Sequence, residues 1–231
     1  MTNIWTLFWL RTKQYLANKE LLIQILLPYG FVTLYSKLMN IKGQDGLPLL
    51  FMFIAMSFSI GIGIPIATIV SKEKEENNLK SLFLAGVSHI EYIIGSIIYP
   101  FLLTLMTIFI LPLITQTNIL DITHLGAYLG VMLLTSINIV LLNSAIAMLA
   151  DTQAKAKVYG FPIMFLIMML PILSHTSDYI ELVGKYSFMG SYIHFFNNIE
   201  TFHLISTDIL SVIVWLVGLL ILNAIIFNHN H

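Results

Sequence analysis

Long apolar runs alternate with short polar stretches along the chain, and this alternation predicts its architecture. An α-helix rises about 1.5 Å per residue, so about 20 apolar residues cross the roughly 30 Å hydrocarbon core of a membrane. Six runs have this length: Leu21–Met39, Pro48–Val70, Tyr92–Thr115, His124–Ala150, Val158–Leu173 and Asp208–Phe227. They leave no room for a separate soluble domain, so we expect one all-α transmembrane domain over residues 1–231.

Residues 1–19 are too polar to span a membrane, but their pattern is helical. On a helical wheel, apolar and polar residues separate into two faces: Trp5, Phe8, Trp9 and Leu16 on one, and Arg11, Gln14 and Asn18 on the other. This pattern predicts an elbow helix lying in the membrane interface, with its apolar face toward lipid and its basic face toward the headgroups. The alternative is that the tryptophans only anchor the first span. That span is expected to kink or break near Pro28.

The stretch 174–207, before the last run, is too apolar for a free loop. A backbone inside a membrane must satisfy its own hydrogen bonds. We therefore expect one or two short amphipathic helices that fold back into the membrane as a re-entrant segment.

Charge is scarce and concentrated. Hydrophobic residues make up 58% of the chain, the mean hydropathy is +0.87 and only 10% of residues are charged. Six of the charges lie between Lys72 and Lys80, and Glu91 follows at the start of the third run. Such an island must lie on the water side of the membrane. We interpret residues 71–90 as a short helix that contacts a soluble partner; the alternative is a merely solvated loop.

The distribution of Lys and Arg orients the chain. If both termini are cytoplasmic, eight of these residues lie inside and three outside, in line with the bias of positive charge toward the cytoplasm. The chain is thus predicted to be a multi-pass protein of the cell membrane, with the island in the cytosol. The N-terminus lacks the apolar core and cleavage site of a signal peptide.

Most residue patterns that mark a chemical function are absent from the sequence. The only Gly-Lys pair, Gly184-Lys185, lacks the surrounding residues of a phosphate-binding P-loop. The net charge of −1 and the absence of a basic stripe argue against nucleic acid. A metal site is conceivable in the segment 174–207, but polar interfacial side chains explain these residues better, so no metal is expected. The residues concerned are His175, His194, His203 and Glu200.

The predicted spans contain no ionisable residue in mid-membrane, although ion-driven transporters usually need one there. Their polar residues include Asn138, Asn143 and Asn223. We expect these side chains to form hydrogen bonds between helices rather than a substrate site. A transporter of this composition would take its energy from a partner protein.

The island resembles the signature of type 2 ABC exporter permeases. The likeness comprises an acidic and basic run, leucines, a small residue with Val-Ser, then Glu-Tyr and a glycine. The matching residues are Glu73, Glu75, Leu79, Leu82, Leu84, Gly86, Val87, Ser88, Glu91, Tyr92 and Gly95. The family commonly has proline at the position of Gly86 and lysine at that of Ser96.

The resemblance extends to the layout of elbow helix, six spans, coupling helix and re-entrant segment. It implies a second permease, as a homo- or heterodimer, and a separate cytosolic ABC ATPase that binds ATP and Mg²⁺, with no cofactor on this chain. It also implies that the island couples to the ATPase through Glu73, Glu75, Glu76, Leu79, Leu82, Phe83, Gly86 and Glu91.

The same resemblance implies a transport path lined by the second and fifth spans, and ordinary packing is the competing interpretation. The candidate residues are Phe53, Met56 and Ser57 in the second span and Phe161, Phe165 and Met168 in the fifth. In each set the spacing places the residues on one helix face.

Within that family the chain is similar to small permeases that export amphipathic peptides such as phenol-soluble modulins. An aromatic- and methionine-rich interior suits an amphipathic or apolar cargo. The alternatives are a drug, lipid or lantibiotic-immunity permease, or a non-transporting membrane immunity or interaction protein.

Overall fold

The computed structural model describes residues 2–39, 46–118, 124–174, 176–199, 201–203 and 205–229. Over these ranges the chain is helical and contains no strand. Its elements are α1 (Thr2–Ala17), α2 (Lys19–Leu38), α3 (Leu47–Met56), the π-helix η2 (Ser57–Gly63), α4 (Ile64–Glu75), α5 (Asn78–Leu84), α6 (His89–Ile114), α7 (Leu125–Leu149), α8 (Gln153–Leu173), α9 (Asp178–Tyr186), α10 (Gly190–Asn197) and α11 (Ser206–His229).

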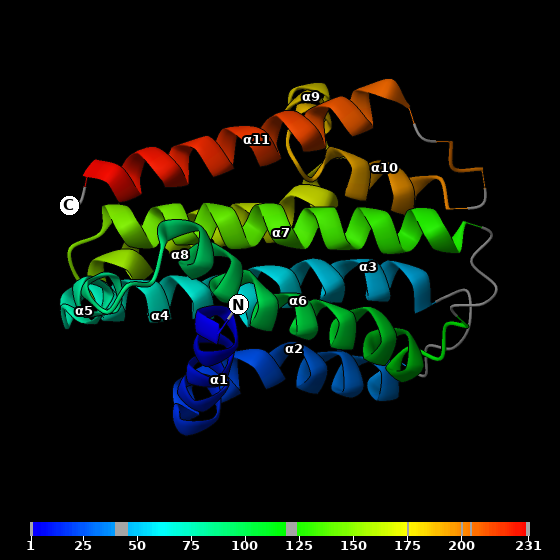
Figure 1. The fold of residues 1–231 in the computed structure, drawn as a ribbon. Coiled ribbons are helices and arrows are strands. Elements are labelled where there is room, and N and C mark those ends of the chain that lie inside the picture. The colour runs from blue at the N-terminus through cyan, green and yellow to red at the C-terminus, as the bar shows by residue number, and fades with distance from the viewer. Residues whose placement is uncertain are drawn as a thin grey trace.

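The predicted spans are confirmed within a few residues, because six stretches in the described ranges are long and apolar enough to cross a membrane. Figure 1 shows them side by side, with α7 in the middle of the bundle and α5 and the end of α11 at the same end. The fifth span begins five residues earlier than expected, at Gln153 rather than Val158. The reason is a cap: the Thr152 side chain accepts a hydrogen bond from the Lys155 N–H.

The second span is longer than expected and is built from three segments. It runs without a gap through α3, η2 and α4 from Leu47 to Glu75, five residues beyond the predicted end at Val70. It is also the most enclosed of the six spans. The first charges of the island therefore extend this helix, and only Asn78–Leu84 form the separate short helix α5.

The expected break at Pro28 is absent, because α2 is continuous from Lys19 to Leu38. Its start is fixed by Asn18, whose side chain accepts a hydrogen bond from the Glu20 N–H. That cap separates α2 from α1, so the two helices can take different directions.

Helix α1 lies across the bundle instead of along it (Figure 1). Its inner face packs against α6, where Leu7 approaches Gly95 and the ring of Tyr15 stacks on Tyr99 at 4.1 Å. Trp5 and Trp9 point away from the protein and are 70% and 55% exposed. An outward apolar face fits the sequence prediction.

The prediction that the basic face of α1 points toward the headgroups is wrong for Arg11. Arg11 is only 1% exposed, and it points into the protein instead of toward headgroups. The physical reason is a buried carboxylate on α4, that of Glu73, with which the guanidinium forms an ion pair. Helical periodicity gives the face of a residue but not the partner that the face meets.

Between α8 and α11 the chain forms two short helices, α9 and α10. The indole N–H of Trp215 donates to the Tyr186 carbonyl at 2.9 Å. Trp215 lies nine residues after the start of α11, which corresponds to about 14 Å along the helix. The end of α9 therefore lies beside the middle part of α11 and not beside its start. From there α10 returns, held by the Tyr192 hydroxyl, which donates to the Phe51 carbonyl.

Candidate functional site at the charged end of the bundle

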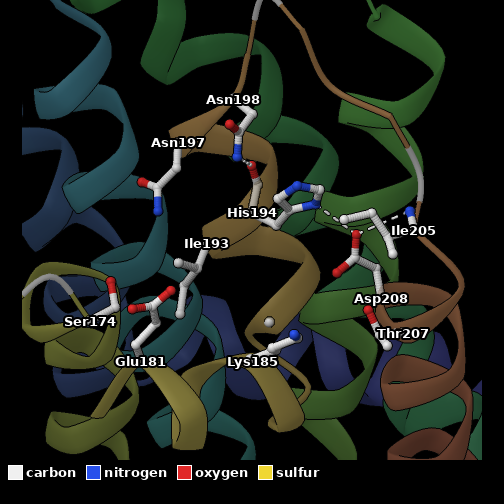
Figure 2. A pocket seen from close by; sticks show the side chains of 11 residues that line it. Ser174, Glu181, Lys185, Ile193, His194, Asn197, Asn198, Ile205, Thr207 and Asp208 are labelled. Carbon is white, nitrogen blue, oxygen red and sulfur yellow. Dashed lines mark hydrogen bonds and ion pairs between the residues drawn. The ribbon is translucent and has the colours of Figure 1, made fainter. Parts of the chain in front are cut away.

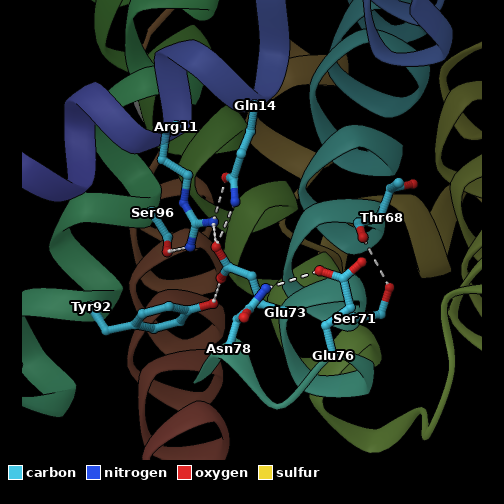
Figure 3. Close-up of polar contacts among 9 residues, drawn as sticks. All are labelled: Arg11, Gln14, Thr68, Ser71, Glu73, Glu76, Asn78, Tyr92 and Ser96. Carbon is cyan, nitrogen blue, oxygen red and sulfur yellow. Dashed lines mark hydrogen bonds and ion pairs between the residues drawn. The ribbon is translucent and has the colours of Figure 1, made fainter. Parts of the chain in front are cut away.

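A buried ion pair joins α1 to α4. Arg11 and Glu73 are 1% and 3% exposed, and their guanidinium and carboxylate are in direct contact. Figure 3 shows that Gln14, Tyr92 and Ser96 complete the group. The Tyr92 hydroxyl and the Gln14 amide donate to the carboxylate at 2.7 and 2.9 Å, and Arg11 Nη2 donates to Ser96 Oγ at 3.0 Å.

The electrostatics of this group make both charges dependent on each other. Burial disfavours the charged form of Arg11, but Glu73 and Tyr92 together outweigh burial and raise the pKa of the guanidinium above its ordinary value. The guanidinium also lies over the Tyr92 ring, 5.2 Å from its centroid. Removing one partner of such a pair would leave an uncompensated buried charge. This arrangement therefore fastens α1 to the ends of α4 and α6.

Helix α5 is set by two tight turns in the left-handed region. Asn77 has φ +58° and connects α4 to α5, and Gly86 has φ +90° after α5. The N–H of Gly86 bonds to the Phe83 carbonyl and that of Val87 to the Leu82 carbonyl, the pattern of a Schellman cap. Proline, with φ fixed near −65°, could not adopt this turn. Glycine at position 86 thus has a local structural reason.

The start of α6 is held by a capping box. The Ser88 side chain accepts a hydrogen bond from the Glu91 N–H, and the Glu91 carboxylate accepts one from the Ser88 N–H at 2.9 Å. Asn3 of α1 also donates to Glu91, at 3.3 Å. The Ser-x-x-Glu spacing is a known helix-start signal, so the sequence carried this information.

Other island charges bind groups of the same chain. Lys74 donates to the Met148 carbonyl at the end of α7, and the Glu75 carboxylate accepts from the Gln153 N–H at the start of α8, at 2.8 Å. Lys72 and Glu76 form an exposed pair at 3.8 Å. Most charged side chains of the island therefore form hydrogen bonds or ion pairs with other residues of the same chain.

An aromatic cluster connects α5 to the spans. The ring of Phe83 lies 4.7 Å from His89, 5.8 Å from Tyr92 and 6.0 Å from Phe227. Tyr92 belongs to α6 and also binds Glu73, whereas Phe227 belongs to the end of α11. Phe83 therefore connects α5 to α6 and α11 through ring contacts, and the short turn at Asn77 connects α5 to α4.

The eight residues expected to couple to an ATPase thus divide into two groups. Glu75, Glu76 and Gly86 are exposed, whereas Glu73 and Leu79 are buried; Leu82, Phe83 and Glu91 are partly buried against the chain itself. The most exposed apolar side chains nearby are Leu84 and Ile90, at 81% and 70%. Leu84 does not share the helix face of Leu79, Leu82 and Phe83, which points into the protein. This break in the periodicity of α5 is the sequence signal that could have identified Leu84 as exposed.

The candidate path residues do not come together within one chain. Phe53 and Ser57 are 1% and 2% exposed; Phe53 packs against Tyr35, and Ser57 Oγ lies 3.1 Å from Thr107 Oγ1. Met56 is partly buried, as is Met168 on α8. By contrast, Phe161 and Phe165 are 59% and 49% exposed and lie 6.5 Å apart. Within one chain, packing against α2 and α6 encloses Phe53 and Ser57, and the lining of a path between two permeases stays a prediction.

The buried polar residues mostly bond backbone. Asn223 Nδ2 donates to the Leu141 carbonyl at 2.9 Å and so joins α11 to α7, as expected for a bond between helices. Asn138 and Asn143 donate to carbonyls of their own helix, and Asn143 also approaches Met164 Sδ. Among the described residues no group of His, Asp and Glu has the arrangement of a metal site. His175 and Glu200 lie outside the described residues.

Six apolar helices of spanning length define a multi-pass, all-helical membrane protein. The family described as ABC-2 type transporter matches residues 2–178, most of the chain. The chain therefore belongs to the ABC-2 type transporter family, as its membrane permease domain, which has no ATPase site of its own and works with an ABC ATPase. No curated protein and no solved structure matches the chain, and the narrower likeness to peptide exporters has no support from them.

Proposed function

We propose that this chain is the permease subunit of an ATP-driven exporter, with α5 as its coupling helix, α1 as an interfacial elbow and α9–α10 as a re-entrant segment. A separate cytosolic ABC ATPase binds ATP and Mg²⁺, and two permeases form the membrane path. The proposal extends the family assignment to the roles of particular helices.

The observation that carries this proposal is the placement of α5. It is a short helix between two tight turns, its inner face is fixed by Leu79 and Phe83, and Leu84 projects from its outer face. A helix held in this way can move as a rigid body, because the two turns and the aromatic contacts of Phe83 restrict its movement relative to the spans. Rigid-body movement of this kind is a common means of switching between states.

The orientation of the chain supports a cytosolic position for α5. Helix α5, the Arg11–Glu73 pair and the end of α11 share one end of the bundle, and this end holds eight of the eleven Lys and Arg residues. Positive residues favour the cytoplasmic side. Both termini would then be cytoplasmic.

Replacing Leu84 with Asp is expected to weaken association with the ATPase. Burial of a leucine side chain contributes about 1.5–3 kcal/mol, so its loss should lower affinity by roughly 10- to 100-fold. The measurement is copurification of a P-loop ATPase from native membranes, together with the ATP hydrolysis of the complex. Leu149→Asp is the matched control, because Leu149 is 62% exposed at the same end of the bundle but lies outside α5.

If the unchanged chain never copurifies with a P-loop protein, the exporter proposal is overturned. If Leu84→Asp and Leu149→Asp behave alike, α5 is not the coupling helix.

The proposed path follows the exposed face of α8. Phe161 and Phe165 stack on the surface of one chain, where a second permease could enclose the path with them. Such a face offers aromatic surface to an amphipathic or apolar cargo, including cytolytic peptides such as phenol-soluble modulins. The cargo class rests on this apolar surface alone.

Phe165→Asn is expected to reduce export several-fold while leaving assembly intact, because the amide replaces apolar contact surface with a group that needs hydrogen bonds. Leu166→Asn is the control, since Leu166 is 63% exposed one position further around the same helix. Export of an amphipathic peptide into the medium is the measurement. Equal export by both variants would place the path elsewhere.

A further inference from the structure

A polar cavity lies among α9, α10 and the start of α11, away from α5. Its volume is about 240 Å³. Figure 2 shows Glu181 and Asp208 on opposite sides of it, with Lys185 and His194 also lining it. Four ionisable side chains thus surround one small space, together with the polar residues Asn197, Asn198 and Thr207.

Two of these side chains, His194 and Asp208, contact each other on one side of the cavity. His194 Nδ1 and Asp208 Oδ2 are 2.7 Å apart, and the same carboxylate oxygen accepts from the Ile205 N–H at 3.4 Å. Asp208 is 4% exposed. This pair positions the start of α11 against α10 and supplies an acidic surface to the cavity.

The other two side chains have no partner in the described part of the chain. Glu181 and Lys185 are exposed and lie four residues apart on α9, a spacing that permits an ion pair, yet no ion pair or hydrogen bond joins either side chain to a described residue. Both line the cavity. One unpartnered anion and one unpartnered cation therefore face the same space.

Helix α9 is oriented so that its apolar side points away from the protein. Tyr179, Leu182, Val183 and Tyr186 recur at helical spacing and are 83%, 55%, 62% and 59% exposed. In a membrane protein, an exposed apolar stripe of this kind contacts acyl chains. The same short helix thus presents lipid-compatible surface on one side and opposite charges on the other.

From this arrangement we infer that the cavity binds the headgroup of a phospholipid that carries both a phosphate and an ammonium group. Lys185 contacts the phosphate, Glu181 contacts the ammonium, and the acyl chains lie along the exposed stripe of α9. A headgroup with phosphate alone would leave Glu181 unpaired beside a second negative charge.

The size of the cavity supports a headgroup over a larger ligand. Pockets for drug-sized molecules measure about 300–1,000 Å³. A cavity of about 240 Å³ is below this range and accommodates a small charged group. The occupant is therefore a small charged group whose remaining part lies outside, as a membrane lipid has.

The test is retention of lipid by the purified full chain. The protein is reconstituted in nanodiscs that contain equal amounts of phosphatidylethanolamine and phosphatidylglycerol, and bound lipids are counted by native mass spectrometry after gentle release. We expect retained phosphatidylethanolamine to exceed phosphatidylglycerol by about 10-fold, because one charge-assisted contact distinguishes the two. Soluble glycerophosphoethanolamine, which has the headgroup without chains, should not displace the lipid at equal concentration.

Glu181→Gln and Lys185→Gln should each lower the retention of phosphatidylethanolamine by about 10-fold. Asp178→Asn is the control, since Asp178 is exposed on the same helix and does not line the cavity. Thermal unfolding midpoints of the three variants should agree, which separates lost binding from lost folding.

Equal retention of both lipids by the unchanged chain would overturn the inference, and so would unchanged retention in either glutamine variant. Loss of phosphatidylglycerol in Lys185→Gln with no effect of Glu181→Gln would identify a simple anion site instead. Displacement by the soluble headgroup would show that the acyl chains contribute nothing, against the role given to α9.

Discussion

Arg11→Ala is expected to lower the stability of the protein more than the removal of any exposed charge. The substitution leaves the Glu73 carboxylate buried without its cation, and breaking a buried pair in this way costs about 3–5 kcal/mol. Tyr92 and Gln14 still donate to the carboxylate, so the loss should fall at the lower end of this range. The measurement is the thermal unfolding midpoint of the purified chain in detergent, together with protease sensitivity of α1.

The control is Lys72→Ala, which removes an exposed partner of Glu76 and should cost less than about 1 kcal/mol. A second variant separates charge from packing: Arg11→Met with Glu73→Met removes both charges and should recover part of the loss. If Arg11→Ala matches Lys72→Ala in stability, the buried pair is not what holds α1.

Gly95→Ala is expected to displace α1 from α6. A Cβ atom at position 95 would lie 2.8 Å from the Leu7 Cβ, closer than two such carbon atoms approach, and the obstacle is not the flexible end of a side chain. Forcing an added methyl into a packed contact typically costs about 1–3 kcal/mol. The expected result is a lower unfolding midpoint and weaker packing of Tyr15 on Tyr99, measurable as increased labelling of α1 by a membrane-impermeant reagent.

Gly126→Ala is the matched control, because a Cβ atom there meets nothing within 4 Å. Alanine in a helix is favoured over glycine by about 0.5–1 kcal/mol, so this control should be neutral or slightly stabilising. Equal unfolding midpoints for Gly95→Ala and Gly126→Ala would show that the contact with Leu7 does not limit the approach of α1 to α6.

The spans could be predicted from the sequence because apolar run length is a direct physical requirement of the bilayer. The ends of the spans were less predictable. Glu73 and Glu75 look like solvated charges in the sequence, but both extend α4, since Arg11 and the Gln153 N–H satisfy them from distant parts of the chain. A local pattern cannot reveal a partner 62 positions away.

In the candidate site, too, local features could be predicted from the sequence and contacts between distant residues could not. The position of α5 between the second and third spans was predictable, as was the cap at Ser88, which has a short-range signature. The direction of each side chain was not. Phe53 and Phe165 are both aromatic residues of apolar spans, yet one is enclosed and the other exposed, because only tertiary packing decides which face of a span meets a neighbour.

The uninterrupted helix from Leu47 to Glu75 has a mechanical consequence for the two faces of the membrane. Its 29 residues correspond to a rod of about 43 Å, longer than the hydrocarbon core. One end continues through a two-residue turn into α5, and near the other end the Phe51 carbonyl accepts the hydroxyl of Tyr192. One continuous helix thus joins the coupling end of the chain to the attachment point of α10 at the other face of the membrane, and the π-helix at Ser57–Gly63 is its irregular segment.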